Sequence, residues 1–223
     1  MVNRKQFAIF DFDGVIFDSK DIAIRNVELL RRQPEFEHLP SPARIGNFSE
    51  IFCGTLRTSL LRFGLTPEES QRFFDSHANL MSEQRELMGL FTGVSEFLRC
   101  IPSDSWAIVT SAYEEVVYDI LEREGVHTAD LIVIGHSIKK SKSAKITDLL
   151  FARGIEVSDV LYIGDMQSDV EYCKEIGIDF VGVDYGYHPR HMLNDPNVCA
   201  VYSTPADLFA AVFKLLNITQ VDC

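Results

Sequence analysis

Five short stretches of this sequence are almost continuously apolar, and each is followed at once by a polar residue or a glycine. Runs of this kind are typical of strands that are covered on both faces, as in a parallel sheet. The runs span residues 6–10, 106–109, 131–134, 160–163 and 180–183. Amphipathic stretches, expected to be helices, lie at 113–124, 143–153 and 168–176. This alternation predicts an α/β fold with a doubly wound, Rossmann-like parallel sheet, in which Gly154 and Gly177 end the last two helices.

Residues 19–89 interrupt this alternation. The segment contains no good candidate for a buried strand, and prolines divide it into stretches of helical pattern. These stretches lie at 22–32, 49–63 and 67–87. We therefore expect a discontinuous α/β core made of residues 1–18 and 90–223, with a smaller helical domain inserted at residues 19–89.

The overall charge limits the classes of partner. The chain carries 33 acidic residues against 21 basic ones, for a net charge of −12. Nucleic acid and anionic membrane surfaces attract clustered lysine and arginine, so neither is an expected partner. No apolar stretch is long enough to cross a bilayer, and the first apolar run meets Asp11 too early for a signal peptide. Five scattered cysteines without a C-x-x-C pair suggest reduced thiols, so we expect a cytoplasmic protein.

Carboxylates follow two of the predicted strands. Asp11 and Asp13 come directly after the first run, and Asp165 follows the fourth, with Asp169 one helical turn later. The carboxyl ends of parallel strands share one edge of a sheet, so we expect these side chains to converge. Converging carboxylates repel each other unless a cation lies between them, and an all-oxygen set beside a phosphate favours Mg²⁺. Two carboxylates could then divide the work of nucleophile and of general acid and base.

Other polar residues stand at the remaining strand ends. Thr110 and Ser111 follow the second run, and four lysines lie at 139–145, between the third run and the next helix. Gly14 allows the backbone to turn sharply after the first run. Each feature alone has an ordinary interpretation, as a turn, a helix cap or a solvated charge. Their order, and their shared place at strand ends, favour a catalytic site.

Two motifs carry a resemblance to a known family. D-F-D-G-V-I-F-D-S at 11–19 and G-D-M-Q-S-D at 164–169, with Thr110 and a lysine between them, resemble the haloacid dehalogenase-like hydrolases, in particular phosphatases of the phosphoglycolate phosphatase type. The second Asp of the first motif points to phosphatases, because the dehalogenases of this family lack it. The resemblance also implies that the helical insert is the family's cap domain.

The resemblance assigns roles to the carboxylates. It implies that Asp11 is the nucleophile and a magnesium ligand, and that Asp13 is the general acid and base, with its backbone carbonyl on the metal. It implies that Asp165 is a metal ligand. Asp169 would be either a further ligand or a group that orients one.

The same resemblance implies a phosphate-binding set of Gly14, Thr110, Ser111 and one catalytic lysine. Thr110 would hold a phosphoryl oxygen through its hydroxyl. Matching the family's K-P-x-P pattern selects Lys140, whereas matching the variant S-K-x-x-K-I selects Lys142. We prefer Lys142, because it directly precedes the predicted helix.

The sequence thus predicts a magnesium-dependent phosphatase that hydrolyses a small phosphate monoester through an aspartyl-phosphate. Phosphoglycolate, a sugar phosphate and a nucleotide all remain open as substrates, and the protein is expected to be a monomer or a homodimer. A phosphomutase, or a catalytically silent phosphate-binding or regulatory protein, are the alternatives. Arg44, Arg57, Arg62 and the loop at 45–47 are candidates for substrate contacts. For His188, a packed or solvated side chain is preferred over one that faces the site.

Overall fold

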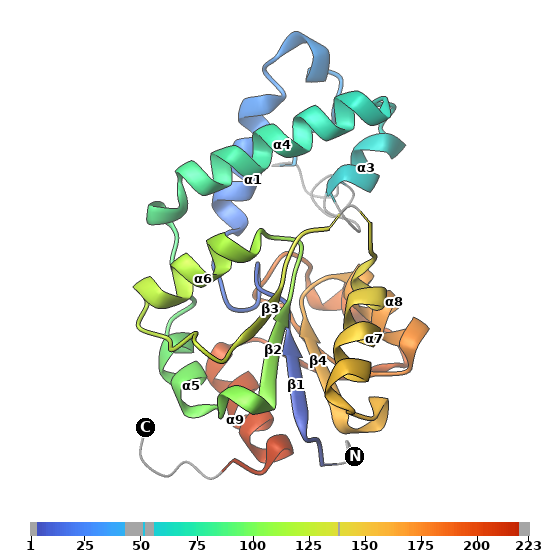
Figure 1. Ribbon diagram of the computed structural model, residues 1–223. Coiled ribbons are helices and arrows are strands. Elements are labelled where there is room, and N and C mark those ends of the chain that lie inside the picture. Colours follow the sequence, from blue (N-terminus) through green and yellow to red (C-terminus); the bar gives the residue numbers. More distant parts are fainter. Residues whose placement is uncertain (1–3, 43–50, 52–55, 138, 219–223) are drawn as a thin grey trace. The chain divides into compact units, whose positions relative to one another are not determined.

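The computed structural model describes residues 4–42, 51, 56–137 and 139–218. The chain divides into two compact units, one of residues 1–18 and 90–223 and one of residues 19–89. Figure 1 shows the strands gathered in the first unit and helices in the described part of the second. None of the helices in the described ranges is both long and apolar enough to cross a bilayer.

Six parallel strands form the sheet of the first unit, in the order β3-β2-β1-β4-β5-β6. Their bounds are β1 Phe7–Phe10, β2 Trp106–Val109, β3 Ile132–Ile134, β4 Val160–Gly164, β5 Asp179–Val183 and β6 Val198–Tyr202. The predicted doubly wound α/β sheet is confirmed. The sixth strand is an addition to the five predicted ones. It lies at the edge of the sheet and its residues are exposed or half-buried, so it lacks the continuous apolar pattern.

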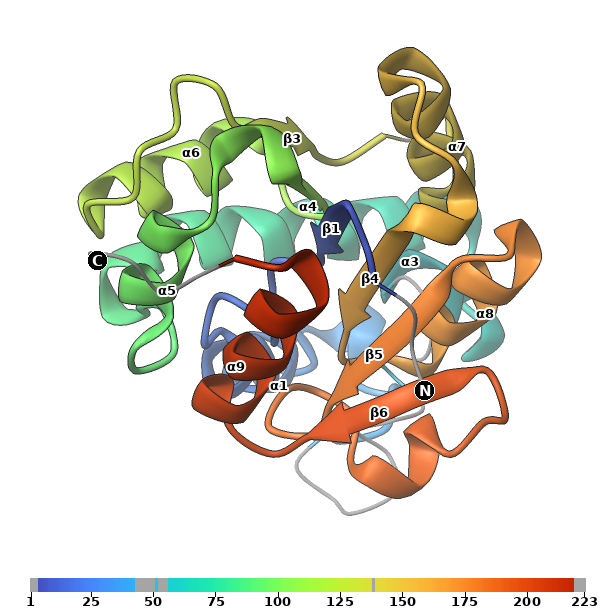
Figure 2. The ribbon, with the colours of Figure 1, turned by 90° about the horizontal axis from the view of Figure 1, so that it is seen from below.

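Helices cover both faces of this sheet (Figure 2). Their bounds are α5 Val94–Cys100, α6 Glu114–Arg123, α7 Lys142–Arg153, α8 Gln167–Ile176 and α9 Pro205–Leu216. Short 3-10 turns lie at η3 Ser103–Ser105, η4 Val157–Asp159 and η5 Arg190–Leu193. As predicted, Gly154 and Gly177 end α7 and α8 in the left-handed conformation.

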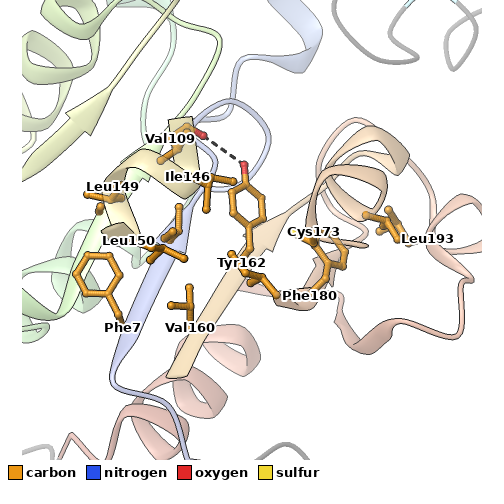
Figure 3. Close-up of a cluster of buried hydrophobic side chains, with 14 residues drawn as sticks. Phe7, Val109, Ile146, Leu149, Leu150, Val160, Tyr162, Cys173, Phe180 and Leu193 are labelled. Carbon is orange, nitrogen blue, oxygen red and sulfur yellow. Dashed lines mark hydrogen bonds between the residues drawn. The ribbon is translucent and has the colours of Figure 1, made fainter. Parts of the chain in front are cut away.

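The side chains of β1 are divided between the two faces. Phe7 and Ile9 belong to a buried cluster with residues of α7 and α8, which Figure 3 draws. Phe10 points the other way and stacks on Phe209 of α9, with ring centroids 5.7 Å apart. Phe209 in turn stacks on Phe97 of α5 at 4.8 Å. Because successive strand residues point to opposite faces, a strand covered on both must be apolar throughout.

The cysteines depart in part from expectation. Cys173 is buried and Cys199 is exposed, and both carry free thiols. Cys100 is disulfide-bonded, which contradicts the expectation of reduced thiols throughout. Cysteine spacing along the chain does not reveal which pairs approach within bonding distance in the fold.

The second unit is helical. Its elements are α1 Lys20–Leu30, η1 Pro34–Phe36, α3 Leu56–Arg62, α4 Pro67–Glu83 and η2 Arg85–Leu87. A capping box begins α4: the Thr66 hydroxyl accepts from the Glu69 N–H at 3.2 Å, and the Glu69 carboxylate accepts from the Thr66 N–H at 2.8 Å. Of the candidate substrate contacts, Arg57 is half-buried and Arg62 is exposed. Arg44 and the loop at 45–47 lie outside the described residues.

A buried histidine joins two helices of this unit. His77 of α4 is 8% exposed, and its Nε2 lies 3.3 Å from the carbonyl oxygen of Ala23 in α1. Burial lowers the pKa of His77 to about 4, although the hydrogen bond to Ala23 acts in the opposite direction. The folded protein therefore holds a neutral imidazole at a pH where the unfolded chain would bind a proton.

We expect the unfolding free energy to fall as the pH drops below the pKa of a histidine in the unfolded chain. The loss due to His77 should be about 2 kcal/mol between about pH 7.5 and about pH 5. His77→Gln keeps an N–H for Ala23 but does not titrate, so its stability should change less over this range. Urea unfolding followed by circular dichroism measures the difference. The exposed His38, changed to Gln, is the control, and an equal pH dependence in His77→Gln and the wild type would contradict the prediction.

Candidate active site

Three acidic side chains meet at the carboxyl ends of β1 and β4. Asp11 follows β1, Asp165 follows β4, and Asp169 lies in the first turn of α8. One carboxylate oxygen from each lies within 4.8 Å of the other two. The neighbouring strands fix this approach, because Phe10 pairs with Ile163 and the Asp11 N–H continues the ladder. All three carboxylates are almost completely buried.

A lysine ammonium lies between two of these carboxylates. Lys142 is the first residue of α7, which Ser141 caps by accepting from the Ala144 N–H at 3.2 Å. Its Nζ is 2.8 Å from Oδ2 of Asp11 and 2.8 Å from Oδ1 of Asp169. Lys140, the other candidate, is exposed and pairs instead with Asp148 of α7. The structure therefore brings Lys142, and not Lys140, to the acidic cluster.

The electrostatics of this cluster are unbalanced. Burial raises the pKa of Asp165 well above its usual value, and the charges of Asp169 and Asp11 raise it further. Burial also raises the pKa of Asp11, against the opposing effect of Lys142. Desolvation acts to lower the pKa of Lys142, but the adjacent carboxylates outweigh it and raise that pKa well above normal. Three carboxylates against one ammonium leave an excess of negative charge in a site that is largely buried.

One buried oxygen in the cluster points to a cation. Oδ2 of Asp165 accepts a hydrogen bond from the Tyr187 N–H at 2.6 Å, whereas Oδ1 is buried and has no hydrogen-bond partner among the described residues. An orphaned carboxylate oxygen in the interior is costly unless a cation neutralises it. A single divalent ion would also remove the excess charge, and oxygen-only donors suit Mg²⁺. The residues present therefore fit a magnesium ion.

The remaining predicted residues lie at the same edge of the sheet, but in different settings. Asp13 is half-buried, and the group of three carboxylates found among the described residues does not include it. Thr110 is buried at the end of β2, where its hydroxyl accepts from the Ala112 N–H at 3.2 Å. Ser111 is exposed. Gly14 has a φ of +78°, and a Cβ there would overlap the carboxylate of Asp165. A glycine at 14 therefore leaves room for the carboxylate of Asp165.

Two further side chains support the cluster from the interior. The Tyr162 hydroxyl lies 3.3 Å from the Val109 carbonyl, drawn in Figure 3, and 3.5 Å from Oδ1 of Asp169. Its ring lies 5.7 Å from the Lys142 ammonium. The Lys145 ammonium is buried and donates to the carbonyl oxygens of Thr110 and Gly135, at the ends of β2 and β3. Tyr162 carries no sequence signal beyond its place in an apolar run, where a hydroxyl needs a partner.

Known proteins resemble this chain along most of its length. A profile of the family described as haloacid dehalogenase-like hydrolase matches residues 8–183. The phosphoglycolate phosphatase of Synechococcus elongatus is 28% identical over 216 residues, which cover 95% of this chain and 99% of that protein. The phosphoglycolate phosphatase of Pseudomonas syringae pv. tomato is 25% identical and covers 86% of this chain and 74% of that protein.

Solved structures support the fold. A hydrolase from Pseudomonas syringae superposes with a TM-score of 0.77 at 18% identity, over 94% of this chain and 99% of that one. The family match includes both motifs, at 11–19 and 164–169, and together with these relatives it confirms the predicted phosphatase type of this family. The chain belongs to the haloacid dehalogenase-like hydrolases.

Proposed function

We propose that this protein is a magnesium-dependent phosphatase that hydrolyses a small phosphate monoester through a phosphoryl group carried on Asp11. The observation that carries the proposal is the position of the Asp11 carboxylate. It follows the central strand β1, it is held by the Lys142 ammonium at 2.8 Å, and it lies in a buried cluster that calls for a divalent cation. A carboxylate fixed in this way is oriented for attack, and its side chain has little freedom to rotate.

The reaction has two displacements. A carboxylate oxygen of Asp11 attacks phosphorus, the bond from phosphorus to the ester oxygen breaks, and Asp13 gives its proton to that oxygen. Asp13 then takes a proton from water, whose oxygen attacks phosphorus and breaks the bond to Asp11. Inorganic phosphate leaves, and the Asp11 carboxylate and the protonated Asp13 are regenerated. For one group to act first as acid and then as base, it must reach the leaving oxygen and the attacking water, and its pKa must suit both steps.

Positive charges and hydrogen-bonding groups would hold the phosphoryl group during both displacements. The Lys142 ammonium offsets the charge of the phosphoryl oxygens, and the Thr110 hydroxyl and the Ser111 backbone would hold two of them. Magnesium would be held by Asp11, Asp165 and the backbone carbonyl of Asp13, with Asp169 as a ligand or as the group that orients one. When bound, it supplies charge that reduces the repulsion between a carboxylate nucleophile and an anionic ester.

For the substrate, we propose only classes of compound. The relatives named above are phosphoglycolate phosphatases, so phosphoglycolate is the first compound to test, with sugar phosphates and nucleotides after it. We propose that residues 19–89 act as the cap that selects among them. The net charge of −12 disfavours polyanionic substrates and suits a small ester whose charge a single site can neutralise.

The reaction is tested with Asp11→Asn, which keeps the shape of the side chain but removes the nucleophile. Magnesium-dependent phosphate release from a panel of phosphorylated metabolites should fall by about a thousandfold or more in this variant. Circular dichroism should show an unchanged fold. Exposed Asp75→Asn is the matched control.

Other outcomes of this assay would contradict the proposal. Transfer of the phosphoryl group to a second hydroxyl, in place of release to water, would identify a phosphomutase. Phosphate release from none of the panel by the wild type would favour a silent phosphate-binding protein. Activity retained by Asp11→Asn would refute the role of Asp11.

The choice between the two lysines is tested by changing each to methionine. Lys142→Met leaves two buried carboxylates without their cation, so we expect phosphate release to fall by about a hundredfold or more. Lys140→Met removes only an exposed ion pair with Asp148, and its activity should stay within about twofold of the wild type. Steady-state kinetics on both variants decide the matter. Similar losses in the two would argue against the assignment of Lys142.

The metal is tested through stability, without turnover. At about 100 times its dissociation constant, Mg²⁺ should raise the unfolding free energy by about 2.7 kcal/mol. Asp165→Asn should abolish most of this gain. Without metal, it should be at least as stable as the wild type, because it removes a buried negative charge. Calorimetric melting with Mg²⁺ and with a chelator measures the gain from the metal and the stability of the metal-free protein. Exposed Asp148→Asn should keep the full gain, and an unaltered gain in Asp165→Asn would rule out this metal site.

A further inference from the structure

The loop after β5 contributes an imidazole to the start of α8. His188 is fully buried, and its ring Nδ1 accepts a hydrogen bond from the backbone N–H of Gln167 at 3.0 Å. A ring nitrogen accepts only when it carries no proton, so the ring proton is on Nε2. Gln167 is the first residue of α8, and the first N–H groups of a helix have no partner within it. His188 supplies the acceptor that α8 itself lacks.

Gln167 lies between the two residues of the acidic cluster that follow β4. It lies in the turn between Asp165, at the end of β4, and Asp169, in the first turn of α8. Asp169 is itself tied to this turn, because its Oδ2 accepts from the Met166 N–H at 3.2 Å. A displacement of the Gln167 N–H would therefore move the backbone that carries both carboxylates.

The same loop also holds Asp165 directly. The Tyr187 N–H donates to its carboxylate at 2.6 Å, and the His188 N–H donates to its backbone carbonyl at 3.3 Å. The preceding residue, Gly186, passes so close to this side chain and to the Gly14 carbonyl that a Cβ at 186 would overlap both. Three consecutive residues after β5 thus contact the turn that bears the acidic cluster.

We propose that His188 is a positioning residue of the metal site, whose Nδ1 fixes the turn at Gln167 and thereby aims Asp165 and Asp169 at the cation. His188 acts through these carboxylates and does not contact the substrate. The inference rests on the proposed function, because it assigns the two carboxylates to a metal. Groups that orient metal ligands typically change metal affinity by about 10- to 100-fold when they are lost.

Two substitutions distinguish a positioning role of His188 from a purely structural one, because the two roles rank these substitutions in opposite order. The side-chain oxygen of His188→Asn is as many bonds from Cβ as Nδ1, so it can accept from Gln167. The amide of His188→Gln is one bond longer and reaches the position of Nε2 instead. Glutamine is nearer to histidine in volume, so a residue that only fills space is replaced better by glutamine than by asparagine. A residue that offers an acceptor at Nδ1 is replaced better by asparagine.

The experiment measures Mg²⁺ binding alone, by isothermal titration calorimetry on the full chain, and melting of the metal-free protein. We expect the dissociation constant of Mg²⁺ to rise about tenfold or more in His188→Gln and to stay within about threefold of wild type in His188→Asn. Exposed His191→Gln is the matched control and should bind as the wild type does. In kinetics, the loss in His188→Gln should appear as a higher Mg²⁺ requirement with kcat recovered at saturating Mg²⁺.

The outcomes separate this inference from the proposed function. No Mg²⁺ binding by the wild type would overturn the proposed function itself. Binding by the wild type with equal affinities in the two variants, whether unchanged or equally weakened, would overturn only the role of His188. Tighter binding by His188→Gln than by His188→Asn would do the same. Failure of both variants to fold would also count against it, because His188 would then support the core as a whole.

Discussion

A buried cluster of like charges is the constraint on which the rest of this structure depends. Asp11, Asp165 and Asp169 approach one another in a largely buried site, with the Lys142 ammonium between Asp11 and Asp169. Such a cluster is unfavourable by itself, because each carboxylate loses hydration and repels its neighbours. It persists because several elements fix its members independently. Two neighbouring strands, the starts of two helices and the loop after β5 each hold one part of it.

The sheet topology explains why these elements meet. The strand order places β1 in the interior of the sheet, with β2 and β3 on one side and β4, β5 and β6 on the other. The sheet is therefore extended from β1 first on one side and then on the other. In open α/β sheets, ligands bind at the carboxyl ends of the strands where this direction changes, which here are the ends of β1 and β4. Asp11 and Asp165 follow those two strands. Two acidic residues more than 150 positions apart in the sequence become neighbours for this reason alone.

Much of this arrangement can be predicted from the sequence, because it follows from patterns of a few consecutive residues. An apolar run followed by Asp predicts a buried strand with a carboxylate at its end, and this places Asp11 and Asp165 at one edge. The lysine between the second and fourth strands could be narrowed only to Lys140 or Lys142. The exact start of α7, fixed by the Ser141 cap, decides which ammonium turns inward. Lys142 is the first residue of the helix, whereas Lys140 precedes the Ser141 cap and lies outside it.

Contacts between distant segments were beyond prediction. The edge strand β6 is partly exposed and therefore carries no buried pattern. His188 bonds to a backbone N–H that lies 21 residues earlier, and its neighbours in sequence gave no reason to choose a packed histidine that caps a helix over one that faces solvent. Gly14 has a recognisable turn signal, but its closeness to Asp165 depends on the pairing of β1 with β4. Such features follow from the assembled fold and leave only weak traces in composition.

The division between strand ends and the rest of the chain also explains what the sequence reveals about function. The groups proposed to act at phosphorus come from strand ends and helix starts of the α/β unit, where short motifs report them. These motifs do not depend on the organic group that is esterified to the phosphate, since any phosphate ester presents the same reacting atoms to Asp11. Its selection must fall to residues outside them, and the helical unit offers surfaces whose residues obey only the general rules of helix packing. A reaction class can therefore be read from a few strand ends, whereas a substrate cannot.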